Sequence, residues 1–542
     1  MQNCNIYKKS QLSLAIALTL VSSAPQLANA GAGWGDSTSA NGDPIKTATY
    51  YANSPSGILP ATDCFDTTPP PSGPFDTSVP HTPNDGTAVQ ITCDSGTALR
   101  KFVDTLALPG NIPNNLGNSI PVAVPDTTTY PGSDYYELAV VDYTQKMHSD
   151  LAKATTLRGY VQLSPNGTVS LNYLKGGTIY LPDGTVAKAA AKPSYMGPII
   201  SATSGRPIRV KFYNLLPAGK DGNLHVGVDE TITGAGFGPD DTTKYQQNRA
   251  EIHLHGGDNP WISDGTPHQW ILPAADEIAL KAAKKPEMAR GVSAKNVPDM
   301  PDPGPGAMTY YYPNGQSGRL MFYHDHTIGL TRLTVYSGIA AGYLINDLPN
   351  IGENHPDLKD LLPTDSIPLI IQDKTFVPKD IAMQDAKWDT TLGTEGDLWF
   401  PHVYETNQDP NSYDGTNPVG RWDWGSWFWP IFPSVYDLPT GEIKAENHVT
   451  KLGEGSTTPE AYMDTPVING VAYPTLTVEP KAYRFRVLNA SNDRFVNLGL
   501  YLAADKKTTN PEAPTNSANT VLCDGSNLRP DNTPLLLSLI HI

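Results

Sequence analysis

The chain is 542 residues long, and its 55 Asp and Glu against 38 Lys and Arg give it a formal net charge of −17. Such an acidic surface repels nucleic acid, so a nucleic-acid-binding function is excluded. The 47 Gly and 50 Pro, together with 39% hydrophobic residues, exclude a disordered chain and favour short strands joined by turns.

The first 30 residues have the pattern of a secretory signal peptide. Lys8 and Lys9 form a short positive region, an apolar stretch follows from 12 to 21, and Ala28-Asn29-Ala30 fits the small-x-small cleavage rule. The stretch is too short for a membrane span, and no later apolar run is long enough for one. We therefore expect an exported protein, periplasmic or extracellular, with no membrane span.

Residues 31–134 are rich in Pro, Thr, Asp and Gly, and we expect an ordered but irregular N-terminal extension. Cys64 and Cys93 lie in this segment. In an oxidising compartment they can form a disulfide, and the alternative is two free thiols. Cys523, much later in the chain, is expected to be a small buried hydrophobe.

The first β-rich domain is predicted at 135–347, and it contains two histidine pairs. They are His253-Leu254-His255 and His324-Asp325-His326, each at the end of a strand-like stretch before a loop. Side chains two residues apart on a strand point to the same face, so each pair presents two imidazoles together. Four imidazoles suit copper or zinc better than calcium or magnesium, which prefer oxygen ligands.

Residues 274–302 form an insertion in this domain, with a helical stretch predicted near 275–283 and a Pro-rich loop after it. A linker at 347–360 leads to a second domain at 361–537. The segments 205–214 and 479–489 both alternate basic and apolar residues and end at Asn, which indicates equivalent strands of duplicated domains. The aromatic stretch 422–430 is predicted to pack a long loop at the domain interface, and a substrate surface is the alternative.

The two histidine pairs and their surroundings resemble the multicopper oxidase family, and within it the bacterial laccases, bilirubin oxidases and spore-coat laccases. The resemblance rests on Ser263-Asp264-Gly265 after the first pair and on the segment 329–338 after the second. It covers about residues 99–525 and corresponds to the N-terminal part of the family's chain. It implies an all-β fold of tandem cupredoxin-like Greek-key β-sandwiches, with the second domain incomplete and the third missing.

The resemblance also implies roles for individual residues. His253 resembles the ligand of a type 2 copper, and His255, His324 and His326 resemble ligands of the type 3 coppers in a trinuclear cluster. Asp264 stands where relatives carry an acid that delivers protons, and the alternative is a turn residue before Gly265. Asp325 is expected to face the opposite side and to orient a ligand or a neighbouring loop.

The family's implied reaction is the oxidation of a phenolic, pigment or metal-ion donor coupled to four-electron reduction of dioxygen to water. The HxxHxH and HCHxxxH motifs of the family's last domain do not occur in this sequence, so the type 1 copper site is absent from this chain. We therefore expect an N-terminal fragment that is inactive by itself. Residues 538–542 match a reading of a sequencing-library adapter and are expected to be an artefactual tail; a natural apolar strand is the alternative.

Other functions remain open from the sequence. The first is an exported, non-catalytic copper-binding protein that uses the four histidines alone. The second is a zinc hydrolase that begins with an HxH pair, but the alternating helices of its usual barrel are not apparent. A copper nitrite reductase would need the missing His-Cys pair. The donor and the oligomeric state are not determined by the sequence.

Overall fold

The computed structural model describes residues 99–346 apart from 101, 229, 231–233 and 241, then 366–377, 393–400 and 465–492, and a few isolated positions and short strands. Strands dominate these residues and the helices are short, which confirms the predicted all-β class. Cys64, Cys93, Cys523, the linker, the aromatic stretch and the C-terminal tail lie outside the described residues. The predicted signal peptide also lies outside them, except for β1 (Leu12–Ala15), which pairs antiparallel with β19 (Thr475–Val478).

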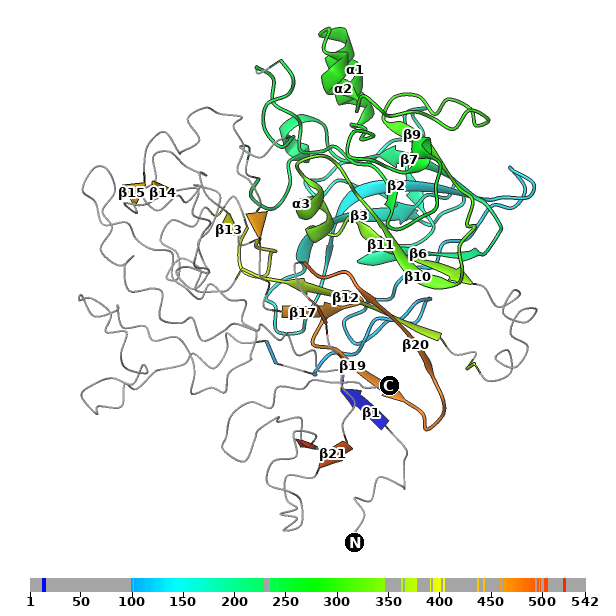
Figure 1. Cartoon of the computed structure of the whole chain (residues 1–542), viewed down its shortest axis with the longest axis vertical. Helices are drawn as coiled ribbons and strands as arrows, with labels where there is room; N and C mark the ends of the chain where they lie inside the picture. The colour runs from blue at the N-terminus through cyan, green and yellow to red at the C-terminus, as the bar shows by residue number, and fades with distance from the viewer. Residues whose placement is uncertain are drawn as a thin grey trace.

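The first domain is a sandwich of two four-stranded sheets (Figure 1). One sheet has the order β3 (Thr155–Gln162), β2 (Asp134–Gln145), β7 (Ile208–Asn214) and β9 (Ala307–Tyr312). The other has the order β6 (Met196–Thr203), β11 (Ala340–Asn346), β10 (Arg319–His324) and β8 (His253–Leu254). The chain passes between the sheets several times, as the expected Greek-key sandwich requires.

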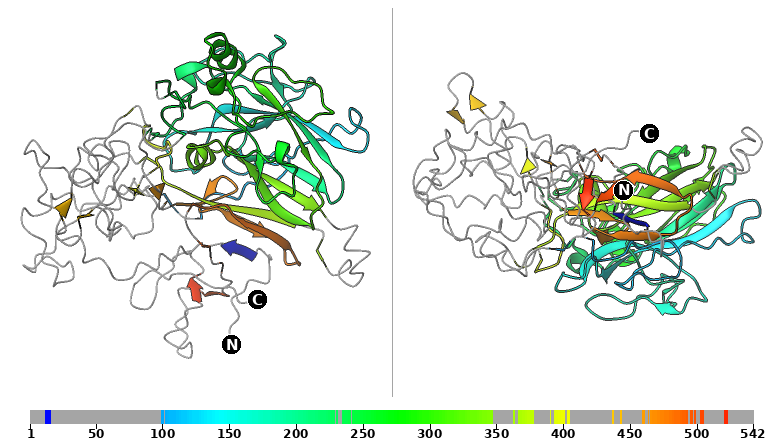
Figure 2. Two further views of the ribbon diagram at one scale, coloured as in Figure 1. Left: turned by 45° about the horizontal axis from the view of Figure 1, so that its top comes forward. Right: turned by 90° about the horizontal axis from the view of Figure 1, so that it is seen from below.

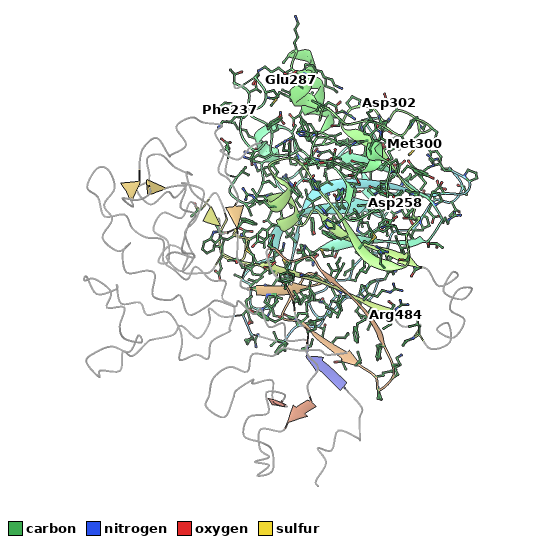
Figure 3. All side chains as sticks on the ribbon, in the orientation of Figure 1. Phe237, Asp258, Glu287, Met300, Asp302 and Arg484 are labelled. Atoms are coloured by element: carbon green, nitrogen blue, oxygen red, sulfur yellow. The ribbon has the colours of Figure 1, made fainter. Side chains whose placement is uncertain are left out.

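The core of the sandwich is built from the inward-facing side chains of both sheets. Leu138, Val140 and Phe212 come from one sheet, and Tyr323 and Tyr343 from the other, and all five are buried. β-branched and aromatic residues of this kind fit a pleated, half-buried surface, which explains why these segments form strands. Figure 3 shows how densely the described side chains fill this region.

The predicted insertion leaves the sandwich as two short helices, α1 (Ala274–Ala282) and α2 (Pro286–Ala289). They project at the top of Figure 1, and Glu287 marks them in Figure 3. The buried carboxylate of Glu277 holds this insertion, because it accepts hydrogen bonds from Arg290 and from the backbone N–H of Gly306. Helix α1 confirms the helical stretch expected near 275–283.

The remaining short elements of the first domain are connectors. They are β4 (Val169–Ser170), β5 (Lys188–Ala189), η2 (Gly219–Gly222), η3 (Trp261–Ser263) and α3 (Thr331–Tyr336). Helix α3 follows the second histidine pair and packs towards the second domain (Figure 2).

The second domain is described as one four-stranded sheet in the order β18 (Val471–Ala472), β17 (Thr465–Ile468), β12 (Ser366–Lys374) and β20 (Arg484–Asn489). Strand β20 runs parallel to β12, as β7 runs parallel to β2 in the first domain. The two segments that share a sequence pattern therefore occupy equivalent places. Two-residue and three-residue pairs complete the assignment: β13 (Val403–Tyr404) with β16 (Pro459–Glu460), β14 (Tyr436–Asp437) with β15 (Glu442–Ile443), and β21 (Leu502–Ala504) with β22 (Thr520–Leu522).

The described end of the N-terminal extension runs along both domains. Thr105 forms a bridge with Thr475 of the second domain, and Val122 forms one with Ile199 of the first. Leu106 packs into the core of the second sheet beside Leu369. This part of the extension is ordered and irregular, and it helps to join the two domains.

Candidate metal centre

Strands β8 and β10 bring the two histidine pairs together. They pair antiparallel, with His253 opposite His324 and Leu254 opposite Tyr323. Directly opposed residues project to the same face of a sheet, so the two imidazoles lie side by side while Leu254 and Tyr323 enter the core. His255 follows immediately, and its backbone N–H donates to the carbonyl of Phe322.

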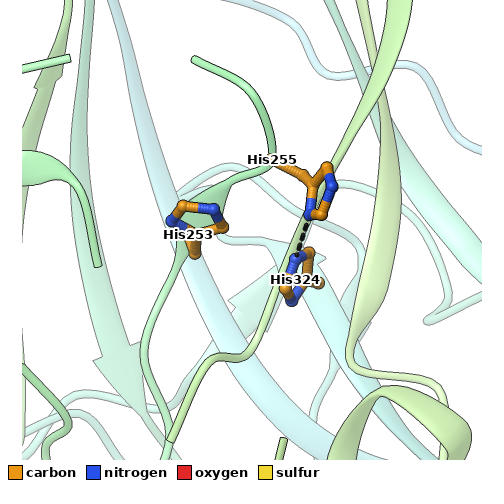
Figure 4. Close-up of side chains that lie close together, drawn as sticks. All are labelled: His253, His255 and His324. Carbon is orange, nitrogen blue, oxygen red and sulfur yellow. Dashed lines mark hydrogen bonds between the residues drawn. The ribbon is translucent and has the colours of Figure 1, made fainter. Parts of the chain in front are cut away.

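All four predicted histidines meet at this face. The ring centroids lie 5.2 Å apart for His253 and His324, 4.8 Å for His253 and His326, and 5.3 Å for His255 and His324. One ring nitrogen from each of His253, His255 and His324 falls within 4.8 Å of the others (Figure 4). The ring of His326 packs beside them, and its buried Nδ1 has no hydrogen-bond partner among the described residues.

Backbone carbonyls set the orientation of two of the rings. Nδ1 of His253 lies 2.6 Å from the carbonyl oxygen of Asp264, and Nδ1 of His324 lies 2.7 Å from that of Asp325. A carbonyl accepts, so each Nδ1 carries the proton and each Nε2 keeps its lone pair. Second contacts of this kind are what fix the tautomer of metal-binding histidines.

Burial favours the neutral form of three of the imidazoles. It is the largest cause that lowers the pKa of His324 to about 3, and the neighbouring histidines contribute to the same shift. Burial is also the largest cause of the lowered pKa values of His253 and His255, to which His326 adds charge repulsion. Metals bind the neutral imidazole, so these rings are in the binding form at physiological pH.

The nitrogen positions fit a metal. Nδ1 of His255 and Nε2 of His324 lie 3.1 Å apart (dashed line in Figure 4). Two imidazole nitrogens about 2.0 Å from one ion in tetrahedral positions would lie roughly 3.3 Å apart. A group of nitrogen donors with no carboxylate in it suits copper or zinc.

Asp264 lies beside the histidines, and its backbone and its side chain make different contacts. Its carbonyl holds His253, whereas its carboxylate is one-third exposed and lies 3.9 Å from the same imidazole nitrogen. The next residue, Gly265, has a φ of 68°, and a Cβ there would collide with the carbonyl of Ile252. Asp264 therefore stands in a turn before Gly265, and its carboxylate lies next to the histidines and is accessible to water.

Asp325 faces away from the imidazoles, as expected. Its fully buried carboxylate accepts hydrogen bonds from the backbone N–H of Glu251 at 2.9 Å, the hydroxyl of Thr327 at 2.8 Å and the hydroxyl of Thr334 at 2.6 Å. One side chain therefore connects the strand that enters the first histidine pair with the segment that follows the second.

Two contributors were missed by sequence reasoning. Phe322 stacks on His255 and His324, with ring centroids 4.8 Å and 4.7 Å away. Its position two residues before His324 on a strand was the signal that it shares the face. Glu251 is fully buried, its carboxylate oxygens have no hydrogen-bond partner among the described residues, and burial raises its pKa well above the usual range. Its position two residues before His253 was the corresponding signal.

The chain matches no family model. It is 28% identical over 405 residues to a laccase from Bacillus subtilis, and 30% identical over 405 residues to a laccase from Bacillus stratosphericus; each match covers 74% of this chain and 52% of the relative. A laccase from Haloferax volcanii is 25% identical over 406 residues, which is 74% of this chain and 45% of the relative. The chain thus spans about half the length of the curated relatives it matches.

Among solved structures, the chain is similar to the McoA multicopper oxidase from Aquifex aeolicus. The TM-score is 0.30 at 17% identity, over 73% of this chain and 46% of that one. By sequence, this chain is similar to laccases of the multicopper oxidase family over about half of their length.

Proposed function

We propose that this chain provides one half of the ligands of the copper cluster in an exported laccase-like oxidase. The reaction would oxidise a phenolic, pigment-like or metal-ion donor and reduce dioxygen to two waters. The observation that supports the proposal is the convergence of His253, His255 and His324, with their ring nitrogens within 4.8 Å of one another. The signal-peptide pattern of residues 1–30 supports export.

Each histidine has a proposed place. His253, whose free Nε2 points to the site, would bind the type 2 copper. His255 and His324, with facing nitrogens 3.1 Å apart, would bind a type 3 copper, and His326 would complete the type 3 ligands of this half. Bound copper would supply the one-electron chemistry that couples donor oxidation to dioxygen reduction.

The residues of this chain prepare the site for that chemistry. Backbone carbonyls orient His253 and His324, Phe322 stacks on His255 and His324, and burial favours the neutral form of these three rings. Reduction of dioxygen to two waters consumes four protons, so a group that exchanges protons with water is needed nearby. The carboxylate of Asp264 is proposed for this role because it is partly exposed and lies 3.9 Å from His253.

The proposal requires four further histidines and a mononuclear copper site. The sequence contains neither the HxxHxH nor the HCHxxxH motif of the family. We therefore propose that the chain by itself binds copper without consuming dioxygen.

The test is a copper titration of the expressed chain, followed by metal analysis after dialysis and by paramagnetic resonance of bound Cu(II). We expect copper to remain bound, and His255→Ala and His324→Ala to lose it. The exposed His268 of the same sandwich provides the control, because His268→Ala should leave copper binding unchanged.

Retention of copper by the His324→Ala chain would refute the ligand assignment. A strong preference for zinc would favour a hydrolytic site instead. Dioxygen uptake by this chain with a phenol, above that of the His324→Ala variant, would contradict its proposed inactivity. Tight copper binding that no chain supplying the missing motifs converts into oxidase activity would favour the non-catalytic copper-binding protein.

A further inference from the structure

Helix α3 connects the metal centre to the second domain. The helix starts at Thr331, shortly after His326, and ends at Tyr336 next to β12 (Figures 1 and 2). Near its middle, the hydroxyl of Thr334 donates to Asp325 at 2.6 Å. Because Asp325 stands between His324 and His326 and also accepts the N–H of Glu251, a displacement of α3 would reach both histidine pairs.

The C-terminal end of α3 is held by the second domain. The ammonium of Lys374, on β12, donates to the carbonyl of Tyr336 at 2.5 Å. The phenol of Tyr336 lies 2.8 Å from the carbonyl of Trp399 and accepts the N–H of Thr375 at 2.6 Å. The last carbonyls of a helix have no partner within the helix, so Lys374 satisfies one of these groups.

Lys374 is an unusual residue for this position. It is 1% exposed, and its ammonium lies 4.2 Å from the ring centroid of Tyr336 and 5.4 Å from that of Tyr195. Burying an ammonium is costly, and an apolar side chain of similar size often gives equal or greater stability. What Lys374 provides is a fixed position and not extra stability, because a cation between two aromatic faces and a helix C-terminus has one favourable place.

We infer that Lys374 is a positioning residue of the metal centre. It acts through the carbonyl of Tyr336, helix α3, Thr334 and the carboxylate of Asp325, and so lets the second domain set the spacing of the two histidine pairs. The inference rests on the proposed function where metal affinity is concerned. The mechanical coupling itself is independent of any metal.

The first experiment measures this coupling without metal. Amide hydrogen exchange is compared between the metal-free full chain and Lys374→Met, which keeps an unbranched side chain one atom shorter and removes the donor. We expect at least threefold faster exchange in segments 325–338 and 250–256, and no change in β2 and β3. Lys153→Met is the matched control, because Lys153 also joins the two domains, through Asp397 at 2.5 Å, without touching α3.

The second experiment uses Cu(II) as the probe. Mutations of residues that support metal ligands typically reduce affinity by 10- to 100-fold. Lys374 is further away, so we expect a loss of about 3- to 10-fold for Lys374→Met and none for Lys153→Met. Thr334→Val removes the link to Asp325 without changing the side-chain volume, and the double variant should lose little more than Thr334→Val alone.

The outcomes separate the two proposals. Faster exchange in both segments with no Cu(II) binding in any variant would retain the coupling and refute the copper site. Copper binding with exchange changes confined to 366–377 and the end of α3 would refute the coupling. Fully additive losses for Lys374→Met and Thr334→Val would also refute it. If Lys374→Met does not fold, Tyr336→Phe is used instead, because it removes the phenol contacts of the same helix end. Unchanged exchange in segments 325–338 and 250–256 of that variant would then refute the coupling.

Discussion

The first sandwich and the sheet of the second domain share a pattern of strand pairing, but the polar residues on their strands have different roles. In each, a later strand runs parallel to the first strand of the domain, β7 along β2 and β20 along β12. The first domain carries the histidine pairs, whereas the described strands of the second sheet contain no histidine. In their place, Gln372 and Lys374 at the end of β12 contact Tyr195 and Tyr336 of the first domain.

The comparison shows that the strand framework does not decide function. A metal site forms where two strand ends meet and both carry histidine at the same face. Buried polar residues at a strand end can instead fasten one domain to its neighbour. The following predictions test this distinction, from the largest expected effect to the smallest.

The largest effect concerns competition between protons and metal. At pH 5, three ordinary imidazoles with a pKa near 6.5 would weaken metal binding by roughly 10⁴-fold or more, because each must first lose a proton. The pKa of His324 is about 3, and those of His253 and His255 are also lowered. We expect Cu(II) affinity to fall far less than about 10⁴-fold between pH 7 and pH 5 in competition titrations, because His324 does not become charged over this range.

The same shifts affect the metal-free chain. The unfolded chain takes up protons below about pH 6.5 that the folded site refuses, so the free energy of unfolding should fall as the pH drops from 6.5 towards 3. The slope should be reduced in His324→Ala. An equal slope in both would show that other groups cause it.

The second prediction concerns Asp325. Its removal leaves the backbone N–H of Glu251 and the hydroxyl of Thr327 without their acceptor in the interior, whereas the hydroxyl of Thr334 can still donate to the carbonyl of Leu330. Asp325→Ala should lower the free energy of unfolding by about 3 kcal/mol, measured in urea. Asp299→Ala is the control, because that carboxylate is largely exposed. A similar loss in both variants would contradict a special role of Asp325.

The third prediction concerns Lys374 in the second domain. Burial lowers its pKa from 10.5 to about 7. The unfolded chain therefore holds one more proton than the folded chain between about pH 7 and pH 10, and stability should rise with pH in that window. Relative to Lys374→Met, the wild-type chain should gain up to about 1.4 kcal/mol per pH unit. A pH-independent difference between the two would show that Lys374 keeps its proton in the folded chain throughout this window, and would contradict a lowered pKa.

The smallest effect is expected at the other lysine between the domains. Lys153 is 41% exposed and pairs with Asp397. Solvent-accessible ion pairs contribute little, so Lys153→Met should change the free energy of unfolding by about 0.5 kcal/mol. Raising the salt concentration to 1 M should remove most of this difference. An effect as large as that of Asp325→Ala would mean that the Lys153–Asp397 ion pair stabilises the chain as strongly as a buried contact, and would contradict the small contribution expected here.

Much of the candidate site could be predicted from the sequence because its residues are close together in the chain. A two-residue period places His253 with His255 and His324 with His326 whatever the rest of the fold does. The helical stretch of the insertion and the repeated strands ending at Asn214 and Asn489 depend on similarly local patterns. The sequence relatives bear out the family, while the individual ligand roles stay predictions.

Other features were decided only by the tertiary structure, because they join residues far apart in the chain. The sequence alone determined which residues can bind metal and on which side of each strand they lie. The pairing of β8 with β10 decided that the two histidine pairs meet, and burial of the rings lowered the pKa values of His253, His255 and His324. The contact of Lys374 with Tyr336 exists only because two domains pack together, and no local period can encode such a contact.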